Sequence, residues 1–155
     1  AEVPVICDPK LTGLHRTVGA TVALFEIRGL ELLRRRSNLP DAESTAAHFI
    51  EEHDWQGMLV LGGEDGTTLY QKDEDPLFLP CLIEVPQQLI GLHDAAATAL
   101  ACALGAGRTL AEGARLANAA CECVLAAETS SVVLGRKKLM TRLDELSWHF
   151  QISDR

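Results

Sequence analysis

Short apolar runs and amphipathic stretches alternate along the first half of the chain. Residues 3–7, 19–25 and 58–61 are apolar runs of the length of buried strands. Apolar residues at helical spacing predict helices over residues 26–36 and 42–53. This mixture of buried strands and amphipathic helices is typical of an α/β protein.

A glycine-rich turn follows the third apolar run. Residues 62–66 are Gly-Gly-Glu-Asp-Gly and precede a further run at 67–70, so a β-hairpin around a tight loop is predicted. A charged turn follows at 72–75. The next strand is predicted over 77–83, and Pro80 places it at a sheet edge because proline cannot donate to a strand ladder.

Two helices rich in small residues are predicted next. A turn at Gly91 leads into an alanine-rich helix, which Gly105 and Gly107 are expected to end. Thr109 and Glu112 have the spacing of a capping box, which predicts the start of the second helix. The predicted inner face of that second helix is formed by Leu110, Ala114, Ala117, Cys121 and Leu125.

The last part of the chain is predicted to contain an extended piece at 130–133 and an amphipathic helix over 136–150. Trp148 and Phe150 are apolar for a chain end, and we expect them to dock on the body of the protein or on a second subunit. The helix residues expected to face inward are Leu139, Leu143 and Leu146.

These elements predict an α/β fold, a three-layer α/β/α arrangement in a single domain that spans residues 1–155. A chain of this length is long enough to bury a core of its own. Its net charge of −8 disfavours nucleic acid as a partner, because phosphate contacts need a basic face. No apolar run is long enough to span a bilayer, and the first residues lack the basic region of a signal peptide. We therefore expect a cytoplasmic protein with no membrane partner.

The five cysteines do not form a recognisable metal or disulfide pattern. Their number is odd, and no Cys-x-x-Cys pair occurs. Cys121 and Cys123 are expected to point to opposite sides of a helix, which suits neither zinc nor a disulfide. We expect buried thiols in a reducing compartment.

Several other polar residues have ordinary structural explanations. The arginines at 34–36 resemble a phosphate-binding patch, but cations in the last turn of a helix also stabilise its dipole. Asp41 follows a turn and is expected to cap the helix after it. His48 and His53 have no potential metal ligands at suitable spacing, so we expect both on the surface.

Asp94 stands at the mouth of the predicted alanine-rich helix. Backbone N–H groups at a helix start lack partners within the helix, and the helix dipole makes that end positive, so anions such as phosphate bind there. One interpretation of Asp94 is an N-cap or first-turn acid that stabilises the helix by about 1 kcal/mol. The other is a general base beside a phosphate site. The local sequence favours the cap and leaves the second interpretation open.

Several short motifs occur in a fixed order along the chain. Residues 5–10 are Val-Ile-Cys-Asp-Pro-Lys, residues 19–21 are Gly-Ala-Thr, and residues 59–66 are Leu-Val-Leu-Gly-Gly-Glu-Asp-Gly. Gly-Leu-His-Asp at 91–94 and Leu-Ala-Asn-Ala-Ala at 116–120 follow. The ordered set resembles the C-terminal half of a ribokinase-like (PfkB-type) carbohydrate kinase. The similarity is closest to the kinase domain that phosphorylates heptose phosphate in ADP-heptose synthesis.

The resemblance implies a fold, a reaction and a set of site residues. The fold would be the nucleotide-binding half of a ribokinase-like kinase, which transfers phosphate from ATP, with Mg²⁺, to a sugar hydroxyl. Asp94 would be the catalytic base that deprotonates this hydroxyl. The residues that the resemblance assigns to the nucleotide are Gly91, Leu92 and His93 in the anion hole, Gly63 and Gly66 in the nucleotide loop, and Asn118 near the base ring.

Other residues differ from the family's motifs. His93 stands where the family has glycine, and Gln88 replaces an aspartate that helps relatives to bind a monovalent cation. The family's Pro-Asn-x-x-Glu, which handles magnesium and phosphate, is Phe-Glu-Ile-Arg-Gly at 25–29, so no residue is assigned as a metal ligand. An alternative is therefore a catalytically inactive relative that binds a nucleotide or phosphate, or only a partner subunit. A third hypothesis is a plain structural module.

The family's N-terminal half, with its sugar pocket and lid, has no counterpart in this sequence. A sheet that begins at residue 3 would expose the edge strand that relatives cover. We expect a partner at this edge, either a second copy of the chain or a missing N-terminal partner.

Overall fold

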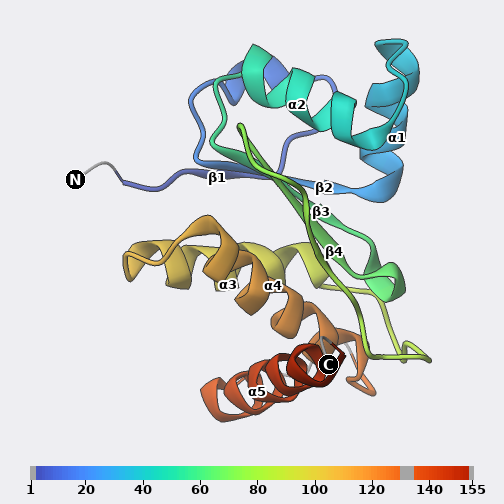
Figure 1. Cartoon of the computed structure of the whole chain (residues 1–155), viewed down its shortest axis with the longest axis vertical. Coiled ribbons are helices and arrows are strands. Elements are labelled where there is room, and N and C mark those ends of the chain that lie inside the picture. The colour runs from blue at the N-terminus through green and yellow to red at the C-terminus, as the bar shows by residue number, and fades with distance from the viewer. Residues whose placement is uncertain (1–2, 130–134, 154–155) are drawn as a thin grey trace. The chain divides into compact units, whose positions relative to one another are not determined.

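The computed structural model describes residues 3–129 and 135–153, with side chains up to residue 148. The chain divides into two compact units. Unit 1 is Ala1–Gly62 with Thr67–Phe78, and unit 2 is Gly63–Gly66 with Leu79–Arg155. Each unit is described by itself, and the ribbon of the whole chain is drawn in Figure 1.

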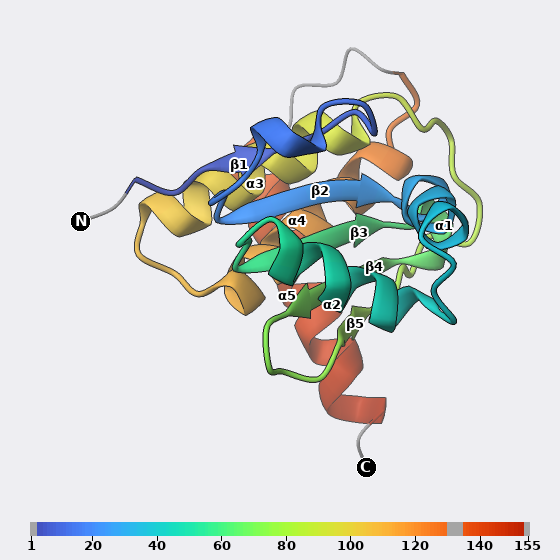
Figure 2. The ribbon, with the colours of Figure 1, turned by 90° about the horizontal axis from the view of Figure 1, so that it is seen from above.

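A five-stranded sheet runs in the order β1-β2-β3-β4-β5. The first three strands are parallel, and β4 is antiparallel to β3, which confirms the predicted hairpin. Figure 2 shows β1 next to β2 at one end of the sheet. The strands are β1 (Ile6–Cys7), β2 (Val22–Glu26), β3 (Gly57–Leu61), β4 (Thr67–Gln71) and β5 (Leu77–Leu79).

The core of unit 1 lies between the sheet and two helices, α1 (Ile27–Arg36) and α2 (Ala42–Glu52), which lie on the same side of the strands in Figure 1. Alternate residues of β2 and β3 point into this core, as the two-residue period of a strand requires. The intervening residues of both strands are buried as well, which explains why the two strands are continuous apolar runs. The core residues include Ala23, Phe25, Leu30, Leu33, Ala46, Phe49, Ile50, Trp55, Met58 and Val60.

The strands at the two ends of the sheet are shorter than predicted. The run at 3–7 was expected to be buried, but only Ile6 and Cys7 pair as β1, and Val3 and Val5 are 81% and 52% exposed. An end strand has a neighbour on one side only, so its residues are covered less than those of β2. At the other end, β5 stops at Leu79, immediately before Pro80.

The prediction of a surface position for His53 was wrong. Its side chain is 7% exposed, and its ring stacks on Trp55 with ring centroids 4.8 Å apart. The His53 Nδ1 lies 3.2 Å from the carbonyl oxygen of Phe49, one helical turn earlier. Trp55 is itself buried and donates from Nε1 to the carbonyl of Thr17 at 2.8 Å. His48 is exposed, as predicted.

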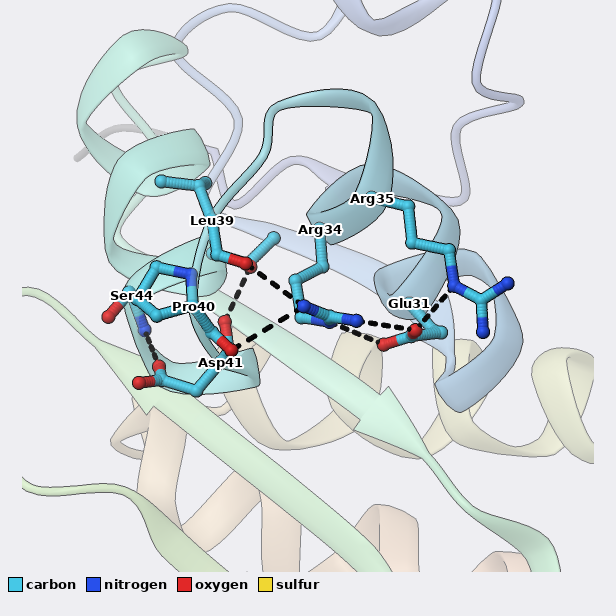
Figure 3. A network of polar contacts seen from close by, with 8 residues as sticks. Glu31, Arg34, Arg35, Leu39, Pro40, Asp41 and Ser44 are labelled. Atoms are coloured by element: carbon cyan, nitrogen blue, oxygen red, sulfur yellow. Dashed lines mark hydrogen bonds and ion pairs between the residues drawn. The ribbon is translucent and has the colours of Figure 1, made fainter.

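The arginines at the end of α1 make local contacts, shown in Figure 3. Glu31 accepts hydrogen bonds from the Nε of Arg34 and of Arg35, both at 2.7 Å. These two bonds lower the pKa of the Glu31 carboxyl from its ordinary value of 4.5 to about 2. Arg34 also donates to the carbonyl of Leu39 at 3.0 Å, so it ties the end of α1 to the turn that follows. These contacts support a structural role for the arginines.

The predicted cap of α2 is confirmed. The carboxylate of Asp41 accepts a hydrogen bond from the N–H of Ser44 at 2.7 Å, and this bond lowers the pKa of Asp41. The hydroxyl of Thr45 donates to the Asp41 carbonyl at 2.6 Å. The side-chain carboxylate and the backbone carbonyl of Asp41 therefore both stabilise the first turn of the helix.

Unit 2 is mainly helical and contains η2 (Gly63–Asp65), α3 (Leu92–Gly105), α4 (Leu110–Leu125) and α5 (Arg136–Ser153). The predicted capping box is present at Thr109 and Glu112. Helices α3 and α4 pack closely because the contact is built from small residues. A Cβ on Gly113 would lie 3.1 Å from Leu100 Cδ2 and 3.6 Å from Ala103 Cβ. Helix α5 packs on α4.

Three predictions for the C-terminal region have different outcomes. Leu146 is buried, whereas Leu139 and Leu143 are partly buried. Trp148 is 67% exposed, so the described part of the chain gives it no docking surface. The predicted extended piece at 130–133 and the side chain of Phe150 lie outside the described residues.

All five cysteines are free thiols, but they are not all buried. Cys121 and Cys123 are buried, whereas Cys102 is exposed on α3, against the prediction. Burial raises the pKa of the Cys121 thiol to about 12. Within the described chain, no helix is both long enough and apolar enough to cross a membrane.

Candidate functional site

Helix α3 begins at a glycine in the left-handed region. Gly91 has φ +94°, and nothing lies within 4 Å of the place where a Cβ would stand. Glycine is needed there for its backbone conformation, and the space beside it is open. The Ala95 N–H donates to the Gly91 carbonyl at 2.9 Å. Because the cap residue is a glycine, no cap side chain accepts a hydrogen bond from the first turn. The N–H groups of the first turn therefore have no partners within the helix itself.

His93 does not disturb this turn. The residue lies in the first turn of α3 with ordinary helical geometry, and it is not among the residues with positive φ. A Cβ therefore carries no backbone penalty at this position. Next to it, the Leu92 carbonyl accepts a weak hydrogen bond from the Cys121 thiol at 3.7 Å, which ties the start of α3 to α4.

Asp94 is not the N-cap of α3. The cap position is Gly91, and Asp94 is an exposed acid in the first turn. Its backbone carbonyl accepts from the hydroxyl of Thr98 at 2.7 Å. The carboxylate has no hydrogen bond or ion pair with the other described residues, so it is available to an incoming group.

A large cavity of about 1170 Å³ lies alongside α3 and includes Gly91 and Asp94 in its lining. Its other walls come from α4 and α5. Small residues of α3 and α4 leave room for it, because an alanine fills less space than a leucine would. The residues that show this are Ala95, Ala99, Ala103 and Ala120.

Gln88 holds the turn before α3 in place, and sequence analysis missed this role. Its Nε2 donates to the carbonyl of Val124 at 2.8 Å, and its Oε1 accepts from the N–H of Ile90 at 2.9 Å. One side-chain amide thus links the last turn of α4 to the Gly91 turn, using its donor and its acceptor. The sequence had marked Gln88 only as a difference from the motif of the resembled family.

The two glycines of the predicted nucleotide loop are both in the left-handed region, with φ +61° at Gly63 and +86° at Gly66. Gly66 is also tightly enclosed. A Cβ there would lie 2.4 Å from the Leu79 carbonyl oxygen and 3.0 Å from Pro80 Cα. The loop therefore needs Gly66 for close backbone approach as well as for its conformation.

Asn118 contacts the same backbone segment. It is 3% exposed, and its Nδ2 donates to the Pro80 carbonyl at 3.1 Å. Asn118 also lines a smaller cavity of about 200 Å³. The other residues around this cavity are Leu79, Arg115, Leu143, Leu146 and Ser147.

The predicted site residues thus form two groups within unit 2. Gly91 and Asp94 line the large cavity, whereas Gly66 and Asn118 enclose the Leu79–Pro80 backbone. Three residues line both cavities: Arg115, Leu143 and Ser147.

A buried glutamate lies on the same face of α4 as Asn118, and no sequence pattern indicated it. Glu122 is 1% exposed, and its Oε1 accepts from the Leu82 N–H at 2.6 Å. Its Oε2 forms an ion pair with Arg142 of α5. Arg142 also pairs with Glu145 at 2.8 Å. A single carboxylate therefore ties α4 to α5 and to the chain after β5.

The described residues contain no group of three or more His, Cys, Asp or Glu side chains that could hold a metal ion. This does not conflict with Mg²⁺ in a kinase, because Mg²⁺ keeps several waters and usually takes only one or two carboxylates beside the substrate phosphates. Any Mg²⁺ here would therefore have to be held largely by a nucleotide.

Solved structures of similar shape identify the fold. The chain superposes on ribokinase from Thermotoga maritima with a TM-score of 0.79 and 20% identity, over 91% of this chain and 49% of that one. It superposes on phosphofructokinase-2 from Escherichia coli, solved in complex with substrates and products, with a TM-score of 0.76 and 16% identity. That match covers 93% of this chain and 48% of the other. The chain therefore has the ribokinase-like α/β fold that the resemblance implied.

The chain also has relatives that are similar to it in sequence. The chain is 36% identical to the bifunctional protein HldE of Photobacterium profundum over 127 residues, which are 81% of this chain. It is 33% identical to HldE of Pectobacterium atrosepticum over 134 residues. The matches span 27% and 28% of the HldE proteins, and no family model matches the sequence. The chain is thus similar in sequence to about a quarter of the length of the HldE proteins.

Proposed function

We propose that this chain is the nucleotide-binding half of an ATP-dependent sugar kinase that acts on a sugar phosphate such as heptose phosphate. The observation that carries the proposal is the open turn at Gly91 with Asp94 in the first turn of α3, both in the lining of one large cavity. The homology to HldE and the ribokinase-like fold support it.

In this proposal Asp94 is the general base. Its carboxylate accepts the proton of the sugar hydroxyl as that oxygen attacks the terminal phosphate. The N–H groups that follow Gly91, on Leu92, His93 and Asp94, donate to the phosphate oxygens as negative charge develops on them. Bound ATP·Mg²⁺ supplies the phosphoryl group and a positive charge beside it.

The other predicted site residues take supporting roles. Gly63 and Gly66 shape the loop that borders the nucleotide, and Asn118 lies near its base. Asp94 and the first turn of α3 fit an anion and a reacting hydroxyl, because the glycine leaves space and the carboxylate is exposed.

ATP·Mg²⁺ titration by calorimetry tests the binding part of the proposal. Gly91→Ala should weaken ATP binding by about tenfold or more, since a Cβ strains the left-handed turn that presents the N–H groups. Gly107→Ala is the matched control, because Gly107 also has positive φ and open space but ends α3. Equal binding by both variants and the wild type would contradict the anion hole.

The catalytic part needs an assay of phosphate transfer to a sugar phosphate. Asp94→Asn should keep ATP affinity within about threefold yet lower kcat by about a hundredfold or more, because the amide cannot accept the proton. Asp75→Asn, a change of an exposed acid in the turn before β5, should leave kcat unchanged. A protein that binds ATP without transfer to any sugar phosphate would indicate an inactive relative.

The proposal also includes a partner at the β1 edge of the sheet. This edge carries the exposed side chains of Val3 and Val5, and an end strand offers unpaired backbone groups to another strand. A second copy of the chain or a separate N-terminal partner would cover it. Analytical sedimentation of the wild type and of Val5→Lys tests this, because a complex formed through the β1 edge should dissociate in the variant.

An ATP-dependent kinase with free thiols would work in the cytoplasm.

A further inference from the structure

Helix α5 covers the face of α4 that carries Asn118. Leu143, Leu146 and Ser147 of α5 line the small cavity together with Asn118 and Arg115 of α4. Leu146 is 3% exposed and Asn118 is also 3% exposed, so the two helices exclude solvent from this face. In the proposed function, this is the face that borders the nucleotide base.

The space left beside Asn118 is too small for a nucleotide. The cavity measures about 200 Å³, whereas pockets that hold whole ligands usually measure about 300–1,000 Å³. Leu143 and Ser147 of α5, together with Arg115 of α4, line both this cavity and the large one that contains Asp94, so they lie between the two. A nucleotide with its phosphates at Gly91 and its base at Asn118 would therefore have to displace this part of α5.

The contact between α5 and α4 is fastened at one buried point. Glu122 is 1% exposed and pairs with Arg142, while its second oxygen accepts from the Leu82 N–H. Outside this pair, α5 contributes mostly partly buried or exposed side chains, including Leu139, Met140 and Leu143. A helix held by one buried ion pair and a narrow apolar stripe can be released by the loss of either.

We propose that α5 is an autoinhibitory lid on the nucleotide site, closed by a latch formed by Glu122 and Arg142. The lid rests on the proposed function, because it regulates that same nucleotide site. Docked α5 blocks the base position at Asn118, and undocked α5 joins the small cavity to the large one. ATP then binds only to the fraction of molecules with α5 undocked, so the apparent dissociation constant is the intrinsic one divided by that fraction.

Two variants of the full chain open the lid by different means. Arg142→Met removes the latch partner but leaves a buried carboxylate behind, which risks a folding defect. Leu143→Ser weakens the apolar contact and leaves the ion pair intact, so it serves where Arg142→Met does not fold. Arg35→Met is the control, because it removes an exposed arginine paired to a glutamate in unit 1.

Hydrogen exchange of the α5 amides and ATP·Mg²⁺ calorimetry are measured on each protein. We expect exchange in α5 and ATP affinity both to rise about tenfold or more in the two lid variants, and neither to change in Arg35→Met. If α5 exchange rises while ATP affinity stays at the wild-type value, the lid is refuted and the proposed function stands. If neither variant raises α5 exchange, the latch is refuted. If opened variants and the wild type all fail to bind ATP, the proposed function fails together with the lid.

Discussion

Unit 1 and unit 2 each contain a glutamate that holds arginine, but the two glutamates differ in burial. Glu31 lies on the surface of α1 and pairs with two neighbours on its own helix, Arg34 and Arg35. Glu122 is enclosed and binds partners 20 and 40 residues away, Arg142 and the Leu82 backbone. The contacts of Glu31 lie on the surface of a helix that apolar packing already stabilises, whereas the contacts of Glu122 join three segments of unit 2. The same residue type therefore has a local role in one unit and a tertiary role in the other.

The largest difference in the free energy of unfolding should appear between two single variants, each of which removes one of these carboxylates. Glu122→Ala is expected to lower the free energy of unfolding by about 3 kcal/mol, because it leaves a partly buried arginine and a backbone N–H without their partner. Glu31→Ala should have a far smaller effect, since water replaces the exposed pair. Urea unfolding followed by circular dichroism measures both. Equal losses would show that burial does not distinguish the two glutamates.

A comparison of two glycines sharpens the same contrast. Gly66→Ala is expected to cost about 3 kcal/mol, because its Cβ would stand 2.4 Å from the Leu79 carbonyl oxygen in addition to straining a positive φ. Gly19→Ala in unit 1 should cost only about 1–2 kcal/mol, since its φ is +78° but its surroundings are open. Urea midpoints of the two variants against the wild type give the difference. A smaller loss of stability for Gly66→Ala than for Gly19→Ala would mean that the loop in unit 2 can rearrange to accommodate a Cβ.

Each unit also contains a buried side-chain nitrogen that donates a hydrogen bond to a backbone carbonyl distant in the sequence. Trp55→Phe removes the bond to Thr17, and Asn118→Leu removes the bond to Pro80. Each change leaves a carbonyl without its donor, and we expect a loss of about 1–2 kcal/mol in both cases. Thermal unfolding checks this. A loss confined to one of them would show that the two anchors are not equivalent.

The smallest effect concerns pH. The pKa of Glu31 is about 2 in the folded protein and lies below its ordinary value of 4.5, so its ion pairs contribute stability above that ordinary value. The contribution is lost as pH falls from about 4.5 to about 2. Wild type and Glu31→Gln should therefore differ slightly in unfolding temperature near neutral pH and converge near pH 2. A gap that widens in acid would contradict the assignment.

Most of unit 1 was predictable from the chain alone. Continuous apolar runs identified β2 and β3, and the glycine loop between two such runs identified the hairpin. His53 was misplaced because its environment depends on the rings of Phe49 and Trp55, which a search for metal ligands does not consider. The ends of the sheet were overestimated, since apolar residues do not show how many neighbours a strand has.

The candidate site was predictable where local geometry defines it. Gly91, Gly63 and Gly66 were recognisable because left-handed turns favour glycine whatever their tertiary surroundings. Gln88 and Glu122 were missed because they bind partners 36 residues away in the first case and 20 and 40 residues away in the second, and no local rule pairs them. Sequence patterns therefore identified the turns, while the polar contacts that hold those turns in place required the structure.

The thiols differ in burial, so the native cysteines can serve as labelling sites that report on unfolding. Cys102 is exposed and should react with an alkylating reagent at once, so it provides the reference for a fully accessible thiol. Cys7 belongs to unit 1 and Cys121 to unit 2, and burial raises their pKa to about 11 and about 12. Both thiols should react more slowly than Cys102 while the protein is folded, and a rise in either rate would show that its own unit has opened. Mass spectrometry of the two sites would thus follow the opening of unit 1 and of unit 2 separately, without any engineered probe.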